Sequence, residues 1–168
     1  MLILGIDPGS RHTGYALVEA RHQRLKALEY GRFTCPSRQA IPERLAHLSD
    51  ALRLLLEQRE PDAAVVETPF HGLNSRSLVV LAQARGALLA VLAAHGIKIR
   101  EYSPAEVKSA VAGNGRADKE QVARMVRLIL ALPDEPRSSD AADALALAIC
   151  YAHRDPIDRL REAERPAV

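Results

Sequence analysis

The stretch LILGIDPG, residues 2–9, decides the fold that the rest of the chain must complete. A short aliphatic run that ends at a Pro-Gly pair is typical of a buried strand closing in a turn. An acid that directly follows such a run has no natural place in a hydrophobic core. We therefore predict a first strand at residues 2–7, with Asp7 as a candidate site residue at its carboxyl end.

Downstream, the spacing of apolar residues predicts strands followed by alternating helices and strands. Alternation predicts two strands at about 14–19 and 25–33, which complete a three-strand meander. Helical spacing at 41–57 and 74–95 is interleaved with strand-like runs at 63–67 and 97–102. Capping and breaker residues predict three more helices, starting near Pro104, Asp118 and Ser138 or Ser139, the last ending near His153. We expect an α/β fold in which helices cover both faces of a mixed central five-stranded sheet.

Length and composition predict a single domain. A chain of 168 residues fits one compact unit, which we place at residues 1–153, and the charged tail at 154–168 carries two prolines and is expected to be mobile. The longest uninterrupted apolar stretch, residues 87–94, is shorter than a bilayer span, and the amino-terminal run lacks the features of a signal peptide. These patterns predict a cytoplasmic protein with no membrane partner. Cys35 and Cys150 lack metal-site spacing and are expected to pack in the core.

Four acidic residues are predicted to converge. Glu67 follows an apolar strand in the same way as Asp7, and ligands bind beyond the carboxyl ends of strands in α/β sheets. Asp140 and Asp143 lie three residues apart, on one face of the last helix. A cluster of carboxylates raises its own pKa values unless a cation neutralises it, and an all-oxygen donor set suits Mg²⁺ or Mn²⁺. Taken singly, Asp140 and Asp143 also fit the first turn of a helix, and Glu67 also fits an ordinary turn.

The charge balance is compatible with a polyanionic partner. The formal net charge is +2, but setting aside four of the 21 acids for one site leaves 17 against 23 Lys and Arg, a surplus of +6. Such a surplus favours nucleic acid among possible partners. The same balance is also common in proteins that bind no nucleic acid.

A second interpretation starts from the glycines after the first strand. Residues 7–14, DPGSRHTG, resemble the first phosphate loop of the actin and sugar-kinase superfamily, in which backbone amides hold nucleotide phosphates. That superfamily requires a second related domain with a second phosphate loop. A chain of 168 residues is too short to hold both.

Two longer motifs are more specific. The chain carries GIDPGSRHTGY at residues 5–15 and DAADALA at residues 140–146, with QARG at 83–86 and Val107-Lys108 between them. Together with the positions of Glu67, Phe70, Asn74 and Lys119, these motifs resemble the RuvC family of Holliday-junction resolvases over residues 1–153. The resemblance implies an RNase H-like fold, a homodimer, and Mg²⁺-dependent nicking of two opposed strands of a four-way DNA junction that leaves 5′-phosphate and 3′-hydroxyl ends.

The resemblance also implies roles for individual residues. Asp7, Glu67, Asp140 and Asp143 take the family's metal-binding catalytic positions. Two Mg²⁺ ions per site, which Mn²⁺ is expected to replace, would serve the attacking water and the leaving oxygen. Lys119 matches a family lysine near the scissile phosphate and would stabilise transition-state charge, although a lysine at the start of a helix is often merely solvated.

Further residues are implied as DNA contacts. Phe70 would stack on or wedge between bases, and Asn74 and Lys108 match family positions near the DNA. The loop at residues 71–73 is less basic than in some relatives, and Arg76 is expected to supply the missing charge. Arg116 follows a Gly-Asn-Gly turn whose amides could approach a phosphate, but such a turn is also an ordinary helix connection.

The helix at 74–95 is apolar nearly all round, which one small core does not explain. Its small residues Ala82, Gly86, Ala90 and Ala93 or Ala94 recur at near four-residue spacing and predict a dimer interface. The resemblance adds a branch-migration complex as partner, made of a junction-binding protein and a hexameric motor ATPase. Two other classes stay open, namely an RNase H-like nuclease acting on other structured nucleic acid and a non-enzymatic binding module. A module of that kind would be expected to have lost an acid, and all four are present.

Overall fold

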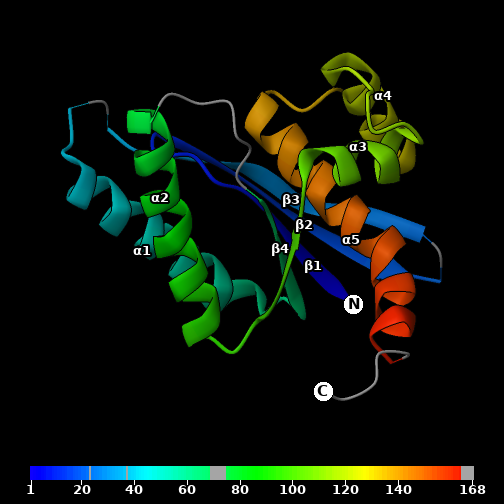
Figure 1. The fold of residues 1–168 in the computed structure, drawn as a ribbon, viewed down its shortest axis with the longest axis horizontal. Helices are drawn as coiled ribbons and strands as arrows, with labels where there is room; N and C mark the ends of the chain where they lie inside the picture. The colour runs from blue at the N-terminus through cyan, green and yellow to red at the C-terminus, as the bar shows by residue number, and fades with distance from the viewer. Residues whose placement is uncertain (23, 37, 69–74, 164–168) are drawn as a thin grey trace.

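The computed structural model describes residues 1–22, 24–36, 38–68 and 75–163, which form a central sheet with helices on both faces (Figure 1). The sheet has five strands in the order β3-β2-β1-β4-β5. Strand β1 pairs antiparallel with β2 and parallel with β4, so it lies at the centre. The strand bounds are β1 Leu2–Asp7, β2 His12–Arg21, β3 Arg24–Thr34, β4 Ala63–Glu67 and β5 Lys98–Tyr102. The predicted fold class is confirmed.

The helices divide between the two faces of this sheet. Helices α1 (Ile41–Arg59) and α2 (Ser75–Ala94) cover one face, and α3 (Pro104–Ala112), α4 (Lys119–Ile129) and α5 (Ser139–Ala163) lie on the other (Figure 1). Each face buries its own apolar core. Both cysteines are buried and unpaired, Cys35 in the core under α1 and Cys150 in the core under α5.

Two glycines set the distance between α5 and the sheet. A β-carbon on Gly5 would collide with the carbonyl oxygen of Ala144, and one on Gly14 would collide with the carbonyl oxygen of Asp140. Only glycine permits this approach, because backbone atoms of α5 occupy the space that any side chain would need. The first turns of α5 therefore rest directly on β1 and β2, which brings Asp140 and Asp143 to the end of β1.

A β-bulge in strand β3 changes which face of the sheet its side chains point to. Leu17 pairs with Glu29 and Val18 pairs with Ala27, so Leu28 has no partner on β2. An extra residue of this kind reverses the alternation of side chains beyond it. On the far side of the bulge, Tyr30 and Arg32 consequently lie on the α5 face of the sheet.

The predicted end of the last helix is wrong. Helix α5 continues past His153 to Ala163, so much of the expected tail is helical. The first two charged residues of the expected tail contact strand β5. Asp155 is buried with its carboxylate 3.5 Å from Lys98 Nζ, and the Arg154 guanidinium lies 5.2 Å from the centre of the Tyr102 ring. Composition alone could not reveal these partners on β5. Residues 164–168 lie outside the described residues, and the boundary of the domain stays a prediction.

The apolar part of helix α2 is longer than the uninterrupted run at residues 87–94 indicated. Among the described residues it is long and apolar enough, by length and composition alone, to cross a membrane, with a mean hydropathy of 1.8 over residues 76–94 and 22% of that segment buried. Core helices of globular proteins pass the same test. In this fold Ala84, Leu88 and Leu92 of α2 pack in the core under α1, whereas Val79 is 57% exposed. The helix thus covers the sheet with one face and leaves an apolar face open.

Candidate active site

Strand pairing brings the two strand-end acids together. Strands β1 and β4 are parallel neighbours with Ile6 opposite Val66, so Asp7 and Glu67 leave the sheet at the same edge. Asp140 and Asp143 approach the same edge from α5, whose first turn begins at the Ser138 cap. The Asp7 carboxyl is electrostatically coupled to the other three acids. The structure therefore places the four acids near one another at this edge of the sheet, while their roles as metal ligands stay predictions.

Three of the four acids have raised pKa values, because nearby positive charge does not compensate for their burial and mutual repulsion. Burial raises the pKa of Asp7 to about 7 from its ordinary value of 3.8, and repulsion from Asp143, Glu67 and Asp140 contributes to the rise. Burial is also the main cause of the raised pKa values of Glu67 and Asp143. Lys119 opposes the rise at all three residues but does not cancel it. A folded protein retains such a cluster readily when a cation binds there.

The donor set fits a hard divalent cation. All four candidate ligands are carboxylates, which suit Mg²⁺ or Mn²⁺ better than softer metals. Among the residues that the structure describes, no three His, Cys, Asp or Glu side chains form a ready-made metal cage. The four carboxylates are electrostatically coupled through Asp7 without forming such a cage, so metal binding would require their side chains to draw together.

Two lysines border the acids on the side of α3 and α4. A pocket of about 240 Å³ is lined by Glu67, Lys108, Lys119 and Asp143, together with Pro104, Val107, Val122 and Ala146. Lys119 is the first residue of α4, directly after the capping residue Asp118, and its Nζ lies 3.4 Å from Asp143 Oδ2. Its side chain is 79% exposed, so the ion pair contributes little to stability and leaves the ammonium free for a ligand.

Comparison with known proteins identifies the family. A family model described as crossover junction endodeoxyribonuclease RuvC matches residues 3–151. The chain belongs to the RuvC family. The RuvC of Moorella thermoacetica is 47% identical over 164 residues, covering 98% of both chains, and that of Syntrophomonas wolfei is 46% identical over 153 residues, covering 91% of this chain and 89% of its own.

Solved structures agree with this assignment. T. thermophilus RuvC in complex with Holliday junction substrate superimposes with a TM-score of 0.89 at 33% identity, covering 94% of this chain and 96% of that one. The yeast mitochondrial Holliday junction resolvase Ydc2 shares the fold with a TM-score of 0.68 at 15% identity. The fold is RNase H-like, as the resemblance to the RuvC family implied, and the family is one of metal-dependent nucleases.

The structure does not bring every predicted RuvC-type contact to the acids. Arg76 is exposed on the first turn of α2, and Arg116 is exposed with its backbone N–H donating to Asn114 Oδ1 at 2.9 Å. Neither lines the pocket beside Glu67 and Asp143. Phe70 and Asn74 fall outside the described residues. Their roles stay predictions.

Two arginines at this RuvC-type site had no predicted role. Arg85 Nε donates to the backbone carbonyl oxygen of Glu67 at 3.1 Å, and its Nη2 lies 2.7 Å from Glu101 Oε1. The signal available in the sequence was a charged residue within the QARG motif at 83–86, in the middle of a mostly apolar helix. Arg32 Nη1 lies 3.7 Å from Asp140 Oδ2, and finding it required knowledge of the bulge in β3.

Proposed function

We propose that this chain resolves four-way Holliday junctions by Mg²⁺-dependent nicking of two opposed DNA strands at symmetric positions, leaving 5′-phosphate and 3′-hydroxyl ends in recombination and repair. The observation that carries this proposal is the cluster of four coupled carboxylates, with raised pKa values at Asp7, Glu67 and Asp143, on a chain of the RuvC family. A nuclease site is expected where buried acids need cations and lysines stand beside them.

The four acids are the proposed metal ligands. Asp7, Glu67, Asp140 and Asp143 would hold two Mg²⁺ ions, and Mn²⁺ would substitute for Mg²⁺. When bound, such ions supply an activated water and stabilise the leaving oxygen of a phosphodiester. Asp7 is coupled to each of the other three acids, so it is the proposed shared ligand.

Lys119 is the proposed cationic catalyst. Its exposed ammonium beside Asp143 faces the pocket that also holds Lys108 and Glu67. A cation held at this place stabilises the charge that develops on phosphate oxygens in the transition state. Lys108 contributes a second charge, and Phe70, Asn74, Arg76 and Arg116 are the proposed contacts to DNA outside the cleavage centre.

A second copy of the chain is the proposed occupant of the open face of α2. Ala82, Gly86, Ala90 and Ala93 are exposed there, and a β-carbon on Gly86 would meet no heavy atom within 4 Å. A ridge of small residues allows two helices to cross closely. Two-fold symmetry would then present two acid clusters, one for each strand to be cut.

The remaining parts of the proposal follow from the family resemblance. We propose a cytoplasmic protein without a membrane partner, since a second copy of the chain is the proposed cover for the open face of α2. The branch-migration complex, a junction-binding protein with a hexameric motor ATPase, is the proposed protein partner.

An end-labelled mobile four-way junction tests the proposal. The wild-type chain and Asp7→Asn would be incubated with the junction, with a linear duplex and with an RNA–DNA hybrid, each in Mg²⁺ and in EDTA. Paired symmetric nicks on the junction alone, present in Mg²⁺ and absent in EDTA and in the variant, are expected. Cutting of the hybrid would instead indicate an RNase H-like nuclease with another substrate, and tight binding without cutting would indicate a binding module.

A further inference from the structure

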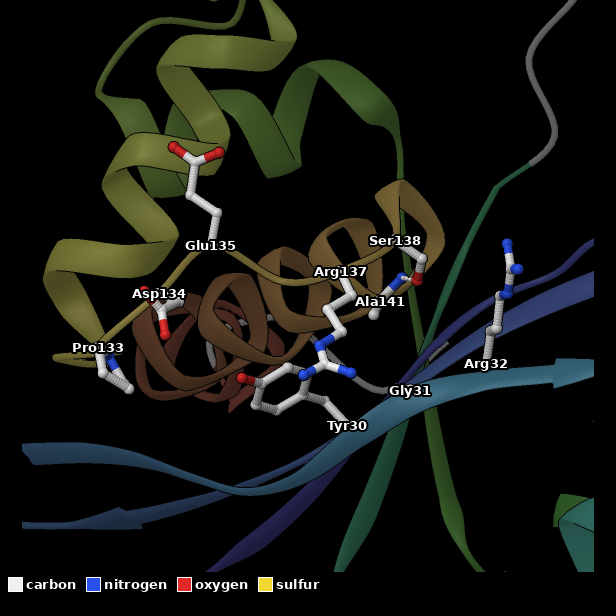
Figure 2. A pocket seen from close by; sticks show the side chains of 9 residues that line it. All are labelled: Tyr30, Gly31, Arg32, Pro133, Asp134, Glu135, Arg137, Ser138 and Ala141. Carbon is white, nitrogen blue, oxygen red and sulfur yellow. Dashed lines mark hydrogen bonds between the residues drawn. The ribbon is translucent and has the colours of Figure 1, made fainter.

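A pocket of about 580 Å³ is lined in part by Arg32, whose side chain pairs with Asp140, and by Ala141, the residue after Asp140 (Figure 2). It lies between strand β3 and the loop that leads into α5, and its volume is within the range of about 300–1,000 Å³ typical of small-ligand sites. Its lining residues come from two segments far apart in the sequence: Tyr30, Gly31 and Arg32 from β3, and Pro133, Asp134, Glu135, Arg137, Ser138 and Ala141 from the loop and α5. Neither the four acids nor the lysines line it.

The bulge at Leu28 is what gives this pocket its floor. Beyond the bulge, Tyr30 and Arg32 lie on the α5 face of β3. Tyr30 is 37% exposed although its ring is large, and Figure 2 shows the Arg137 side chain reaching from the loop toward this ring. Proteins that bind single-stranded nucleic acid combine an exposed aromatic ring, on which a base stacks, with a nearby guanidinium that contacts a phosphate.

The charges in the pocket are separated. Asp134 lies at the end beside Pro133, and Glu135 points away from Tyr30 toward the α4 side (Figure 2), where it also borders a pocket with Lys119 and Arg124. Arg32, whose Nη1 lies 3.7 Å from Asp140 Oδ2, is at the other end of the pocket, with Ser138 on the same side and Arg137 between it and Asp134 (Figure 2). The part of the pocket that adjoins the cleavage centre is therefore basic.

Arg32 is available to a ligand at this end. Its guanidinium is 3.7 Å from the Asp140 carboxylate, and both side chains are partly exposed. A pair of this length and exposure contributes little free energy, so an incoming phosphate competes with it easily. Cations therefore lie beside both acids of α5, Lys119 beside Asp143 and Arg32 beside Asp140.

We propose that this pocket holds one nucleotide of the cleaved DNA strand next to the scissile phosphate, with its base on the Tyr30 ring and its phosphate between Arg32 and Arg137. The inference rests on the proposed nuclease function and adds a subsite that fixes the position of the strand. A strand that continues from Asp140 past Arg32 would enter this pocket.

Neutral phosphate substitution tests the phosphate contact. A methylphosphonate is placed at each position within a few nucleotides of the cut, and junction affinity is measured with the full chain carrying Asp7→Asn, which prevents cutting. One position is expected to weaken binding by about fivefold or more. Arg137→Ala in the same background is expected to remove that penalty and to lower the slope of log affinity against log salt by about 0.7 to 0.9.

A matched control and a base probe complete the test. Arg53→Ala removes one exposed cation from α1, on the other face of the sheet, and is expected to leave every methylphosphonate penalty unchanged. 2-Aminopurine beside the cut is expected to lose fluorescence on binding to the protein with Tyr30 and to lose less with Tyr30→Ala. Equal penalties and equal quenching in variants and parent would overturn the subsite. If the wild-type chain cuts junctions while these results are negative, the subsite alone fails; absence of cutting would refute the nuclease proposal itself.

Discussion

Arg85 ties helix α2 to the strand that carries Glu67. Its Nε donates to the Glu67 carbonyl oxygen at 3.1 Å, its Nη2 lies 2.7 Å from the Glu101 carboxylate, and the side chain is only 15% exposed. One residue thus connects the helix proposed to form the dimer to the backbone of a proposed metal ligand. Arg85 is a positioning residue in this arrangement, because it acts on Glu67 through the main chain.

Arg85→Met is expected to raise the Mg²⁺ concentration for half-maximal nicking by about tenfold or more, since loss of a group that orients a ligand weakens metal binding. Arg85→Lys retains the charge and is expected to recover part of the loss. Mn²⁺ binding followed by paramagnetic resonance gives a second readout that does not depend on cleavage. Arg53→Met serves as control, and an unchanged Mg²⁺ requirement in Arg85→Met would show that Arg85 only stabilises the fold.

The raised pKa of Asp7 predicts how stability depends on pH without metal. Between its ordinary pKa of 3.8 and the folded value of about 7, the folded protein retains a proton that the unfolded chain has lost. This contribution to stability is complete below pH 3.8 and is lost as the pH rises to about 7. In EDTA at pH 8, Asp7→Asn is therefore expected to melt at a higher temperature than the wild type.

The comparison is made by thermal unfolding of both proteins at pH 5 and pH 8, in EDTA and in Mg²⁺. Mg²⁺ is expected to narrow the difference at pH 8, because a bound cation neutralises the ionised carboxylates of the wild type. A variant less stable than the wild type at pH 8 in EDTA would contradict the electrostatic interpretation of the site.

Gly14→Ala tests the contact between α5 and the sheet. The added methyl group meets the backbone carbonyl of Asp140, which cannot move unless the helix moves. We expect a loss of about 1–3 kcal/mol in the free energy of unfolding, as for other overpacked sites, together with slower nicking. Gly31→Ala is the control, because its methyl group meets only the Tyr15 side chain at 3.3 Å and should cost less. Urea unfolding measures both, and equal stabilities would refute the close-approach argument.

Gly86→Leu tests the proposed dimer. The leucine enters open space in the single chain, so the protomer should still fold. It is expected to separate the two copies of α2 and to leave the protein monomeric at micromolar concentration in sedimentation experiments. Val79→Glu, at another exposed point of the same helix, should have the same effect. Variants that both sediment as dimers would place the interface elsewhere.

Lys119→Met tests transition-state stabilisation. Loss of a preorganised cation of this kind typically lowers the chemical rate by about 10²–10³. Junction affinity is expected to change little by comparison, because the lysine contributes one of several phosphate contacts. Single-turnover nicking and equilibrium binding separate the two effects. A parallel loss in both would make Lys119 a DNA-binding residue without a catalytic role.

The sequence predicted those parts of the site that depend on local pattern. Asp7 and Glu67 could be placed because each ends an apolar run, and strand pairing then needed only a parallel neighbour for β1. Asp140 and Asp143 followed from helical spacing. These signals are carried by residues within one turn or one strand of the acid concerned.

Features that depend on distant partners were missed. The sequence places Asp155 in a tail that is expected to be mobile, because its burial depends on α5 continuing past His153 to contact Lys98 on β5. Arg32 could not be placed on the α5 face, because alternation along β3 gives the opposite face unless the unpaired Leu28 is known. Arg85 could not be assigned a role, because its acceptor on β4 is a backbone atom that no residue type reveals.

The bulge in β3 divides that strand into two parts. Odd-numbered residues point to the α5 face before the bulge, and even-numbered residues point to that face after it. Removing Leu28 would restore one continuous alternation and would turn the outer half by one residue. Tyr30 and Arg32 would then exchange faces with Glu29 and Phe33, while every backbone element kept its place. The single unpaired residue thus decides which side chains of β3 lie on the face of the sheet that carries the acids. Relatives that differ by one residue in this hairpin would present different side chains next to the same four acids.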